Sequence, residues 1–330
     1  MSIEKSIIIP VYNAEDTIVD CLDSLTKQSI NKEDFEVICI DDGSTDRTNK
    51  LLKNYNKILN YKVFTQVNKG PSQARNKGAE LAEGDIILFT DSDCILDENW
   101  ISEMLKPLED KSIAGVQGAY KTKQNSIIAL FDQIDIESRY NKMKKNDFID
   151  SIGTYSAAYR RDVFMKYGGF NTNYKAASGE DFEFSFLLNK NGYRLVFTEN
   201  AVCYHRHPDT INKYLKTKFS RGYWRTLLYK NYKNKIYNDT YTSFILKLQY
   251  LCIILFIILS VLVLLNFINK ITPIIFAILF ILLQFPFFFF SVKKNYKVAL
   301  LSFIIVTLRS IFFLTGMMLG ASHLIMGKLK

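Results

Sequence analysis

The chain has 330 residues, a formal net charge of +9 and five cysteines, and 48% of its residues are hydrophobic. This length is enough for one α/β domain and a further element. The cysteines are scattered and none forms a CxxC pair, which excludes a disulfide framework and a zinc site and fits a reducing compartment. The basic balance leaves nucleic acid, phosphate-bearing substrates and an anionic membrane surface as candidate partners.

Strand and helix signals alternate through the first third of the chain. Short apolar runs are typical of buried strands, and the segments between them carry apolar residues at helical spacing. The short connections in this order predict a mostly parallel sheet flanked by helices, so the fold class is α/β. The predicted strands are 6–9, 35–40, 61–65 and 85–90, and the predicted helices are 17–28, 46–55, 72–82 with Ser72 as N-cap, and 98–109.

Glycine and asparagine interrupt the middle of the chain more often, and we expect this part to form the acceptor side of a cleft. Its apolar runs are shorter, so the strands are weaker predictions than those before them. The predicted strands are 115–120, 155–159, 194–197 and 201–205, and the predicted helices are 127–145, 162–167 and 180–191.

Residues 211–236 are a basic amphipathic segment. Apolar and aromatic residues recur at roughly helical spacing, and lysines and arginines lie between them without any acidic residue. Such a helix is typical of a membrane surface. A solvated helix on the globular domain and a nucleic-acid arm are the alternatives, and the apolar segments that follow favour the membrane surface.

Three apolar spans follow, at about residues 249–268, 271–292 and 298–325. Each approaches or exceeds the roughly 20 residues that cross a bilayer. The loop 293–297 is basic, and the positive-inside rule places it and residues 211–240 on the cytoplasmic side.

The N-terminal residues do not form a signal peptide, because the apolar run 7–9 is short and ends at Pro10. We therefore expect a multi-pass integral membrane protein whose first domain faces the cytoplasm. The predicted division is an α/β domain at 1–208, an interfacial segment at 209–243 and a membrane domain at 244–330.

Arg309 falls about halfway along the third span, where a charge is costly and indicates a functional site. It could meet a lipid phosphate, Gln284 or a neighbouring helix; alternatively the span begins later and Arg309 extends to the interface. Gly316 and Gly320 form a GxxxG pattern, which favours close helix packing.

Acidic motifs lie at the ends of predicted strands. Asp41 and Asp42 follow the second strand, and Asp91-Ser92-Asp93 follows the fourth. Open α/β sheets bind ligands at the carboxyl ends of their strands, and carboxylates there suit a divalent cation with a phosphorylated substrate. Gly179-Glu180-Asp181 comes later, before a predicted helix.

In this order, over roughly residues 4–210, the motifs resemble those of the inverting family 2 glycosyltransferases, which have a GT-A fold. Each motif alone is weak, but their order in a β/α context is specific. The motifs that carry the resemblance are Ile9-Pro10-Val11-Tyr12-Asn13 with Glu15, Asp41-Asp42-Gly43-Ser44-Thr45-Asp46, Asn68-Lys69-Gly70, Ala74-Arg75-Asn76-Lys77-Gly78, Asp91-Ser92-Asp93, Gly168-Gly169-Phe170 and Gly179-Glu180-Asp181.

The resemblance implies a nucleotide-sugar donor pocket at the first two strands. Pro10, Val11 and Tyr12 would line it, Glu15 would lie near the ribose, and Asp42 would accept a hydrogen bond from the donor base. The alternatives are an ordinary turn for the first segment and helix capping for Asp42.

Arg75 would approach the donor diphosphate, since arginine suits phosphate. The alternative is an ion pair with Glu80 or Asp85. Asp46 is a cap of the next helix rather than a ligand.

The resemblance also implies a Mg²⁺ or Mn²⁺ ion at the Asp91-Ser92-Asp93 motif. Asp93 would contact the metal, Asp91 the ribose or the metal, and Ser92 the donor. The cation would act as a Lewis acid on the departing diphosphate. His205 is the further candidate ligand, with His207 as the alternative, and a structural histidine is equally compatible.

Asp181 is the candidate general base, with Glu180 beside it, because a single in-line displacement requires the acceptor hydroxyl to lose a proton. Residues 178–181 also form a capping box for the helix 180–191. Both roles can hold, because a helix N-terminus favours an ionised carboxylate.

The Gln-x-x-Arg-Trp signature of processive synthases is absent from the sequence, which disfavours a long-chain polymerase. The sequence therefore predicts a membrane-bound, metal-dependent glycosyltransferase that acts on a hydroxyl of a lipid-linked or cell-envelope glycan. A polyprenyl-phosphate glycosyltransferase, which needs no base, is one alternative, and a non-catalytic membrane scaffold with a degenerate transferase domain is another. The sequence has neither a GxGxxG motif after the first strand nor a GxxxxGK[ST] motif, which disfavours a nucleotide-binding oxidoreductase.

Overall fold

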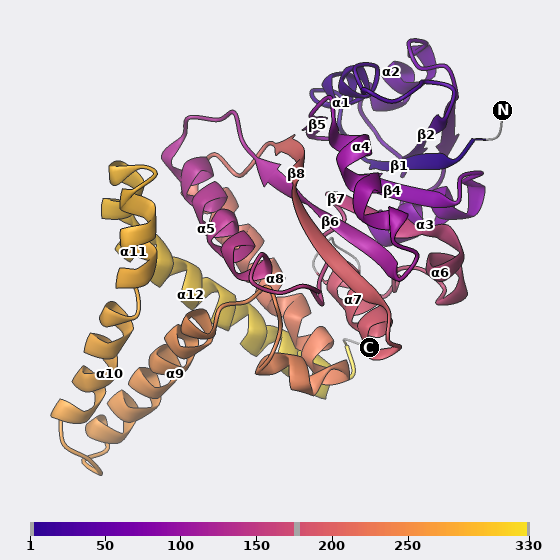
Figure 1. The fold of residues 1–330 in the computed structure, drawn as a ribbon. Coiled ribbons are helices and arrows are strands. Elements are labelled where there is room, and N and C mark those ends of the chain that lie inside the picture. Colours follow the sequence, from indigo (N-terminus) through magenta and orange to yellow (C-terminus); the bar gives the residue numbers. More distant parts are fainter. Residues whose placement is uncertain (1–2, 175–178, 329–330) are drawn as a thin grey trace. The chain divides into compact units, whose positions relative to one another are not determined.

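The computed structural model describes residues 3–174 and 179–328 (Figure 1). The chain forms two compact units. The first comprises Met1–Lys123 and Met143–Arg206, and the second comprises Gln124–Lys142 and His207–Lys330. The helix between residues 124 and 142, which interrupts the first unit in sequence, thus belongs to the second unit.

The first unit is built on one eight-stranded sheet with the strand order β3-β2-β1-β4-β7-β6-β8-β5. Strands β1 to β4 pair in parallel, whereas β7 runs antiparallel to both β4 and β6. This is a mixed α/β sheet with flanking helices, as predicted. The strands are β1 Lys5–Val11, β2 Phe35–Asp41, β3 Tyr61–Thr65, β4 Ile86–Thr90, β5 Cys94–Leu96, β6 Ile113–Lys121, β7 Ser156–Arg160 and β8 Arg194–His205.

Burial explains the central strands. Every residue of β2 is buried, and β1 is buried over most of its length, so both are continuous apolar runs rather than alternating ones. Val11 pairs with Asp41 in the register of β1 and β2, so the two strands end together. The polar residues that follow each strand are therefore brought to one edge of the sheet.

Two strands differ from the sequence prediction. The short strand β5 was not predicted, because its three residues are too few to show the alternating pattern of a strand. The two strands predicted at 194–197 and 201–205 are one long strand, β8, which pairs in parallel with β6 through register shifts and antiparallel with β5.

The helices of the first unit cover the sheet. The predicted N-cap Ser72 is wrong: α3 begins at Pro71, and Gly70 with φ of +91° precedes it. Proline lacks an N–H and is preorganised for the first helical position, so it sets the start of the helix. The helices are α1 Ile18–Leu25, α2 Thr48–Asn54, α3 Pro71–Leu81, α4 Trp100–Leu105, η1 Lys106–Glu109, α6 Arg161–Lys166 and α7 Glu180–Lys190.

Within the described residues of the second unit, the regular elements are all helices. Three of its helical segments are long and apolar enough to cross a membrane: Phe244–Leu264, Ile271–Val292 and Tyr296–Ile325. The middle one is divided into two helices at Leu283 and Gln284. The helices are α5 Ile127–Met143, α8 Ile211–Asn231, η2 Lys233–Ile236, α9 Phe244–Leu264, α10 Ile271–Leu282, α11 Phe285–Val292 and α12 Tyr296–Ile325.

Helices α8 and α12 pack closely through glycines. A Cβ atom on Gly316 would lie 2.1 Å from the carbonyl oxygen of Phe219, and one on Gly222 would lie 2.1 Å from that of Phe313. Gly320 is similarly close to Tyr223. The GxxxG pattern therefore does allow a close helix contact, and its partner is the basic helix α8.

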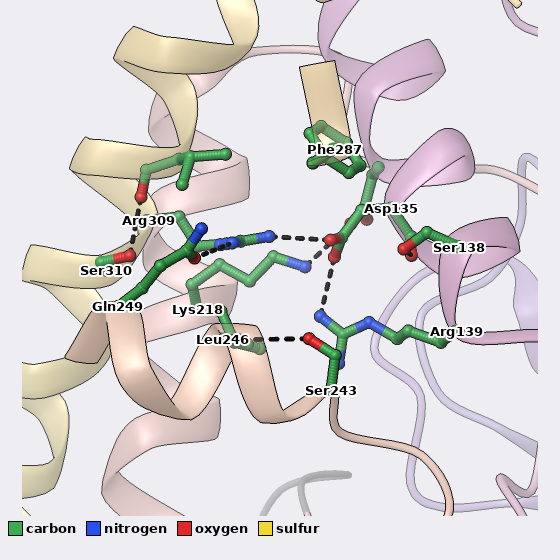
Figure 2. A network of polar contacts seen from close by, with 12 residues as sticks. Asp135, Ser138, Arg139, Lys218, Ser243, Leu246, Gln249, Phe287, Arg309 and Ser310 are labelled. Atoms are coloured by element: carbon green, nitrogen blue, oxygen red, sulfur yellow. Dashed lines mark hydrogen bonds and ion pairs between the residues drawn. The ribbon is translucent and has the colours of Figure 1, made fainter. Parts of the chain in front are cut away.

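Arg309 is buried in the second unit and is held by protein groups. Its guanidinium donates to Asp135 of α5 at 2.7 Å and lies 3.5 Å from the side-chain oxygen of Gln249 (Figure 2). Among the alternatives, the neighbouring helix is correct, whereas Gln284 is not the partner. The arginine does not extend to the surface, since 6% of its side chain is exposed.

Candidate functional site

The loops after β1 and β2 hold each other at the carboxyl edge of the sheet. Asn13 has a positive φ of 48°, which asparagine tolerates better than most residues. Its backbone N–H donates to Ser44 Oγ at 3.0 Å, and its side-chain oxygen accepts from the Thr45 N–H at 2.8 Å. Tyr12 precedes it and is 50% exposed, so its ring is available to a ligand at this edge.

Asp42 organises the loop that leads into α3. Its buried carboxylate accepts from the backbone N–H groups of Lys69 and Gly70, at 2.9 and 2.8 Å, and from the side-chain amide of Gln66 at 2.7 Å. Gly43 beside it has a φ of +75°, and a Cβ there would lie 2.9 Å from the Asn68 nitrogen. Asp42 thus has a structural role here, because it fixes the loop between β3 and α3.

Glu15, a predicted donor residue, and Asp46, a predicted helix cap, both have protein partners at the same edge. Glu15 accepts from the backbone and the side chain of Arg47, at 2.9 and 3.0 Å. Asp46 accepts from the Thr48 N–H at 3.0 Å at the start of α2, so it acts as a local cap. Pro10 and Val11 form the last residues of β1.

Arg75 joins the two acidic motifs. Its Nη1 donates to Glu180, 105 residues away in sequence, at 3.1 Å, and its Nη2 donates to Asp91 at 2.7 Å. The arginine is buried, with 2% of its side chain exposed. The alternative partners considered from sequence are wrong: Glu80 pairs instead with Lys77, and the partners of Arg75 are Asp91 and Glu180.

Asp93 and His205 are brought together by the short strand β5. Cys94 of β5 pairs with His205 of β8, and this register places Asp93 Oδ2 3.4 Å from His205 Nε2. Their side chains are 37% and 18% exposed. Adjacent octahedral ligands about 2.1 Å from one Mg²⁺ ion lie about 3 Å apart, so this pair fits such an ion.

No group of three or more metal-binding side chains occurs within residues 3–174 and 179–328. Two protein ligands are compatible with Mg²⁺ or Mn²⁺, since hard cations of this size commonly keep waters and substrate phosphates as their other ligands. His207, the alternative ligand, lies in the second unit, where its Nε2 is 2.9 Å from the Gln133 side chain.

A pair of tyrosines that the sequence did not single out lies at His205, with Tyr120 in contact with the imidazole. The ring of Tyr120 lies 4.5 Å from the imidazole and stacks on Tyr155 at 3.4 Å between centroids. Tyr120 is the second-last residue of β6 and Tyr155 directly precedes β7, and the sequence pattern placed each only in a predicted strand. Their stacking restrains the ring of His205 beside Asp93.

Asp181 has an electrostatic environment suited to proton transfer. Burial, followed by the negative charge of Glu180, raises the pKa of Asp181 from its ordinary value of 3.8 to about 7. The backbone N–H of Phe182 at 2.8 Å and the charge of Arg75 act in the opposite direction. The expectation that a helix N-terminus keeps Asp181 ionised is thus outweighed by burial and by a like charge.

Glu180 is more deeply buried than Asp181 and is held by two contacts. One oxygen accepts from Arg75, and the other accepts from the Gly179 N–H at 3.0 Å. Gly179 has a φ of +155° at the start of α7. The capping box predicted for this helix begins at Ser178, which lies outside the described residues.

Residues 6–168 match the family described as Glycosyl transferase family 2. The chain is 50% identical over 91 residues to the poly(ribitol-phosphate) beta-glucosyltransferase of Bacillus spizizenii, a match that covers 27% of this chain and 14% of that protein. It is 25% identical over 233 residues to a Methanococcus voltae enzyme, the dolichyl N-acetyl-alpha-D-glucosaminyl phosphate 3-beta-D-2,3-diacetamido-2,3-dideoxy-beta-D-glucuronosyltransferase, which covers 66% of this chain and 71% of that one.

Among solved structures, the chain is similar to the mannosyltransferase PcManGT from Pyrobaculum calidifontis in complex with GDP-Man and Mn²⁺. The TM-score is 0.56 at 19% sequence identity, over 70% of this chain and 64% of that one. The two proteins are therefore similar in the fold of the sheet and its flanking helices.

Proposed function

We propose that this chain, which carries a family 2 glycosyltransferase domain, is a membrane-bound inverting glycosyltransferase. It transfers a sugar from a nucleotide-diphosphate sugar to a hydroxyl group of a lipid-linked or cell-envelope glycan. The observation that carries the proposal is Asp181, whose pKa of about 7 is matched to general base catalysis near neutral pH. It removes the proton of the acceptor hydroxyl as that oxygen attacks the anomeric carbon.

Asp93 and His205 would hold a Mg²⁺ or Mn²⁺ ion, which supplies Lewis-acid stabilisation of the leaving diphosphate. Asp91, which is 30% exposed and fixed by Arg75, orients the donor together with Ser92. We assign Arg75 a positioning role rather than a phosphate contact, because it is buried and already bonded to two carboxylates.

The donor nucleotide lies at the carboxyl ends of β1 and β2 in this proposal. Tyr12 offers an exposed ring for stacking, and Pro10 and Val11 shape the backbone before it. Glu15, which already binds Arg47, borders the ribose side. Asp42 keeps the loop after β3 in place, and a carboxylate oxygen that already accepts from the loop can also accept from a base.

The acceptor is at the membrane. Three apolar helical segments long enough to span a bilayer support attachment to it. The basic residues near them support a catalytic domain on the cytoplasmic face. The Methanococcus relative is named for a dolichyl phosphate-linked acceptor, which supports a lipid-linked glycan here.

The test is turnover of a panel of nucleotide sugars by the full chain purified in detergent, with Mn²⁺ or with EDTA. We expect hydrolysis of one donor that requires metal and is lost in Asp93→Ala. Asp97→Ala is the matched control, because Asp97 caps the turn before α4 through the Asn99 N–H. If metal-dependent turnover and nucleotide binding are both absent, the result would instead support the hypothesis of a non-catalytic membrane scaffold.

A second candidate, transfer to a polyprenyl phosphate, is distinguished by the base. A phosphate acceptor is already a nucleophile and needs no proton removal, so Asp181→Asn would retain activity. For a hydroxyl acceptor we expect Asp181→Asn to lose at least about 100-fold in kcat. Proton NMR of the new anomeric centre then tests inversion.

A further inference from the structure

Helix α12 has the length and the hydropathy of a transmembrane span, yet it is the most covered of the three apolar segments. Within their most apolar windows, 39% of the residues of the third segment are buried, compared with 11% and 17% in the first two. Helix α12 packs mainly against α8 and also contacts α11 and α9, and α5 joins it in a shared buried cluster. Of these neighbours, α5 and α8 carry several charged side chains each.

The contact between α12 and α8 extends along most of α12. Near its beginning, Val298 and Ile305 share a buried cluster with Leu215 of α8. Further on, Gly316 faces Phe219, and His323 Nδ1 lies 3.0 Å from the hydroxyl of Tyr223. The two helices therefore run together, and α8 takes the same orientation to a bilayer as α12.

Inserting α8 across the hydrocarbon core of a bilayer together with α12 would have an unfavourable free energy. Its 21 residues correspond to about 31 Å, close to the thickness of a bilayer core. Lys216 and Arg221 are exposed within its central part, and Lys213 and Lys230 are exposed nearer its ends. An exposed lysine or arginine at the centre of a bilayer is strongly unfavourable.

Helix α5 adds a buried polar network on the same side of α12 (Figure 2). Asp135 accepts from Arg309 and from Arg139, both at 2.7 Å. Asp132 accepts from Lys218 of α8 at 2.8 Å. The Asp135–Arg309 pair lies at the midpoint of α12, where a membrane-spanning orientation would place it at the greatest depth.

The opposite side of α12 is apolar and exposed. At about 100° per residue, its exposed apolar side chains from position 300 onward fall within about 140° of the helix circumference. Arg309, Gly316 and Gly320 lie on the other face, among the buried residues. The exposed residues of this apolar stripe are Leu300, Leu301, Ile304, Ile311, Phe312, Met318, Leu319 and Ile325.

We propose that α12 lies in the plane of the membrane surface, with its apolar stripe in the outer hydrocarbon and α5 and α8 on its aqueous side, and that it does not cross the bilayer. An apolar face on one side and charges on the other are the requirements of an interfacial helix. In Figure 1, α9 and α10 project away from α12 as a hairpin, so the hairpin enters the bilayer while α12 lies across its base. Gln249 and the carbonyl of Leu283, 2.9 Å apart, join the two arms there.

A groove marks the expected level of the lipid headgroups. It has a volume of about 240 Å³ between α8 and α12, and Phe312 of the apolar stripe and Lys216 of α8 both line it. An apolar wall beside an ammonium group is suited to the first carbons and the phosphate of an anionic lipid. This orientation leaves α8 where an acceptor attached to a lipid would be reached from the aqueous side.

The first test is the side of the membrane on which α12 ends. Lys328→Cys, just beyond α12, is compared with Lys230→Cys at the end of α8, using a membrane-impermeant maleimide on intact cells and on inverted vesicles. The natural cysteines are all buried, so the unmodified chain provides the background. We expect both cysteines to react only in inverted vesicles. Reaction of Lys328→Cys in intact cells, with Lys230→Cys protected, would overturn the proposal.

The second test measures depth. Spin labels at Ile304→Cys, Ile311→Cys and Met318→Cys lie on one face of α12 and span about 21 Å along its axis. In vesicles containing anionic lipid, accessibility to oxygen and to a nickel complex should give one shared depth for all three. A progressive change from one surface through the centre to the other would show that α12 crosses. Leu251→Cys and Ile258→Cys on α9, with the same seven-residue spacing, calibrate the change expected for an inserted helix.

Discussion

Replacing Glu180 by glutamine should shift the pH dependence of the reaction without removing the base. The pKa of Asp181 is raised from 3.8 to about 7, and such a change corresponds to about 4 kcal/mol. Burial contributes most to it and the charge of Glu180 is the second cause. Burial remains when that charge is removed, so we expect a partial decrease of about one pH unit, which corresponds to about 1.4 kcal/mol.

The assay is kcat/KM for the donor and acceptor pair between pH 5 and 9. With a pKa of about 7, the wild-type base is about 9% ionised at pH 6 and about 91% ionised at pH 8, so the rate rises about tenfold over that interval. In Glu180→Gln the rise should move about one pH unit lower. Arg75 then keeps only Asp91 as a carboxylate partner, and its less compensated charge acts in the same direction.

Glu183→Gln is the matched control, because Glu183 also lies in the first turn of α7 but accepts from Asn171 at 3.0 Å. Its profile should coincide with that of the wild type. If the rise of kcat/KM occurs at the same pH in Glu180→Gln as in the wild type, or at a higher pH, the assignment of that rise to Asp181 would be refuted.

Three further outcomes are expected. Asp181→Asn should raise the melting temperature in detergent, and this gain should grow as the pH rises from about 4 to about 7 and then level. The reason is that the folded state holds the proton of Asp181 more tightly than the unfolded chain does, so the wild type loses stability over this pH range. A gain that shrinks with rising pH would contradict this. His205→Gln should raise the Mn²⁺ concentration needed for half-maximal turnover, whereas His207→Gln, which alters a contact to Gln133, should leave it unchanged; equal effects would argue against His205 as a ligand. Arg309→Met should destabilise the second unit by about 3–5 kcal/mol, because it leaves the buried Asp135 with one partner fewer, and adding Asp135→Asn should restore part of the loss; additive losses in thermal unfolding would contradict a direct pair.

The sequence predicted the parts of the site that depend on local order. Asp42, Asp91 and Asp93 follow strands whose apolar runs are unmistakable, and parallel pairing brings strand ends to one edge whatever the details of packing. The family resemblance then supplied roles that composition alone could not. Asp181 was selected in this way, but its raised pKa depends on burial and on its neighbour, which no spacing reveals.

The contacts that escaped prediction join residues far apart in sequence. Arg75 and Glu180 are 105 positions apart, and Asp135 and Arg309 are 174 apart. Acids and bases are abundant in this chain, so a single sequence offers many pairings for each and no means of choosing. The burial that selects one pair is a property of the folded units, and it also explains why Glu80 and Asp85 were reasonable but wrong partners for Arg75.

Arg75 shows why the two halves of the site require arginine rather than lysine. Its Nη1 and Nη2 atoms point to different carboxylates, one on the residue beside the proposed base and one on the motif that contains Asp93. The planar guanidinium spans two acceptors in a fixed geometry and stays charged when buried, whereas an ammonium group is a single strongly hydrated point charge. The same contact holds Glu180 in a buried position, and the charge of Glu180 is, after burial, the second cause of the raised pKa of Asp181. The position of Asp91 and the basicity of Asp181 are therefore coupled through one side chain, so a substitution of Arg75 acts on donor placement and on proton transfer together.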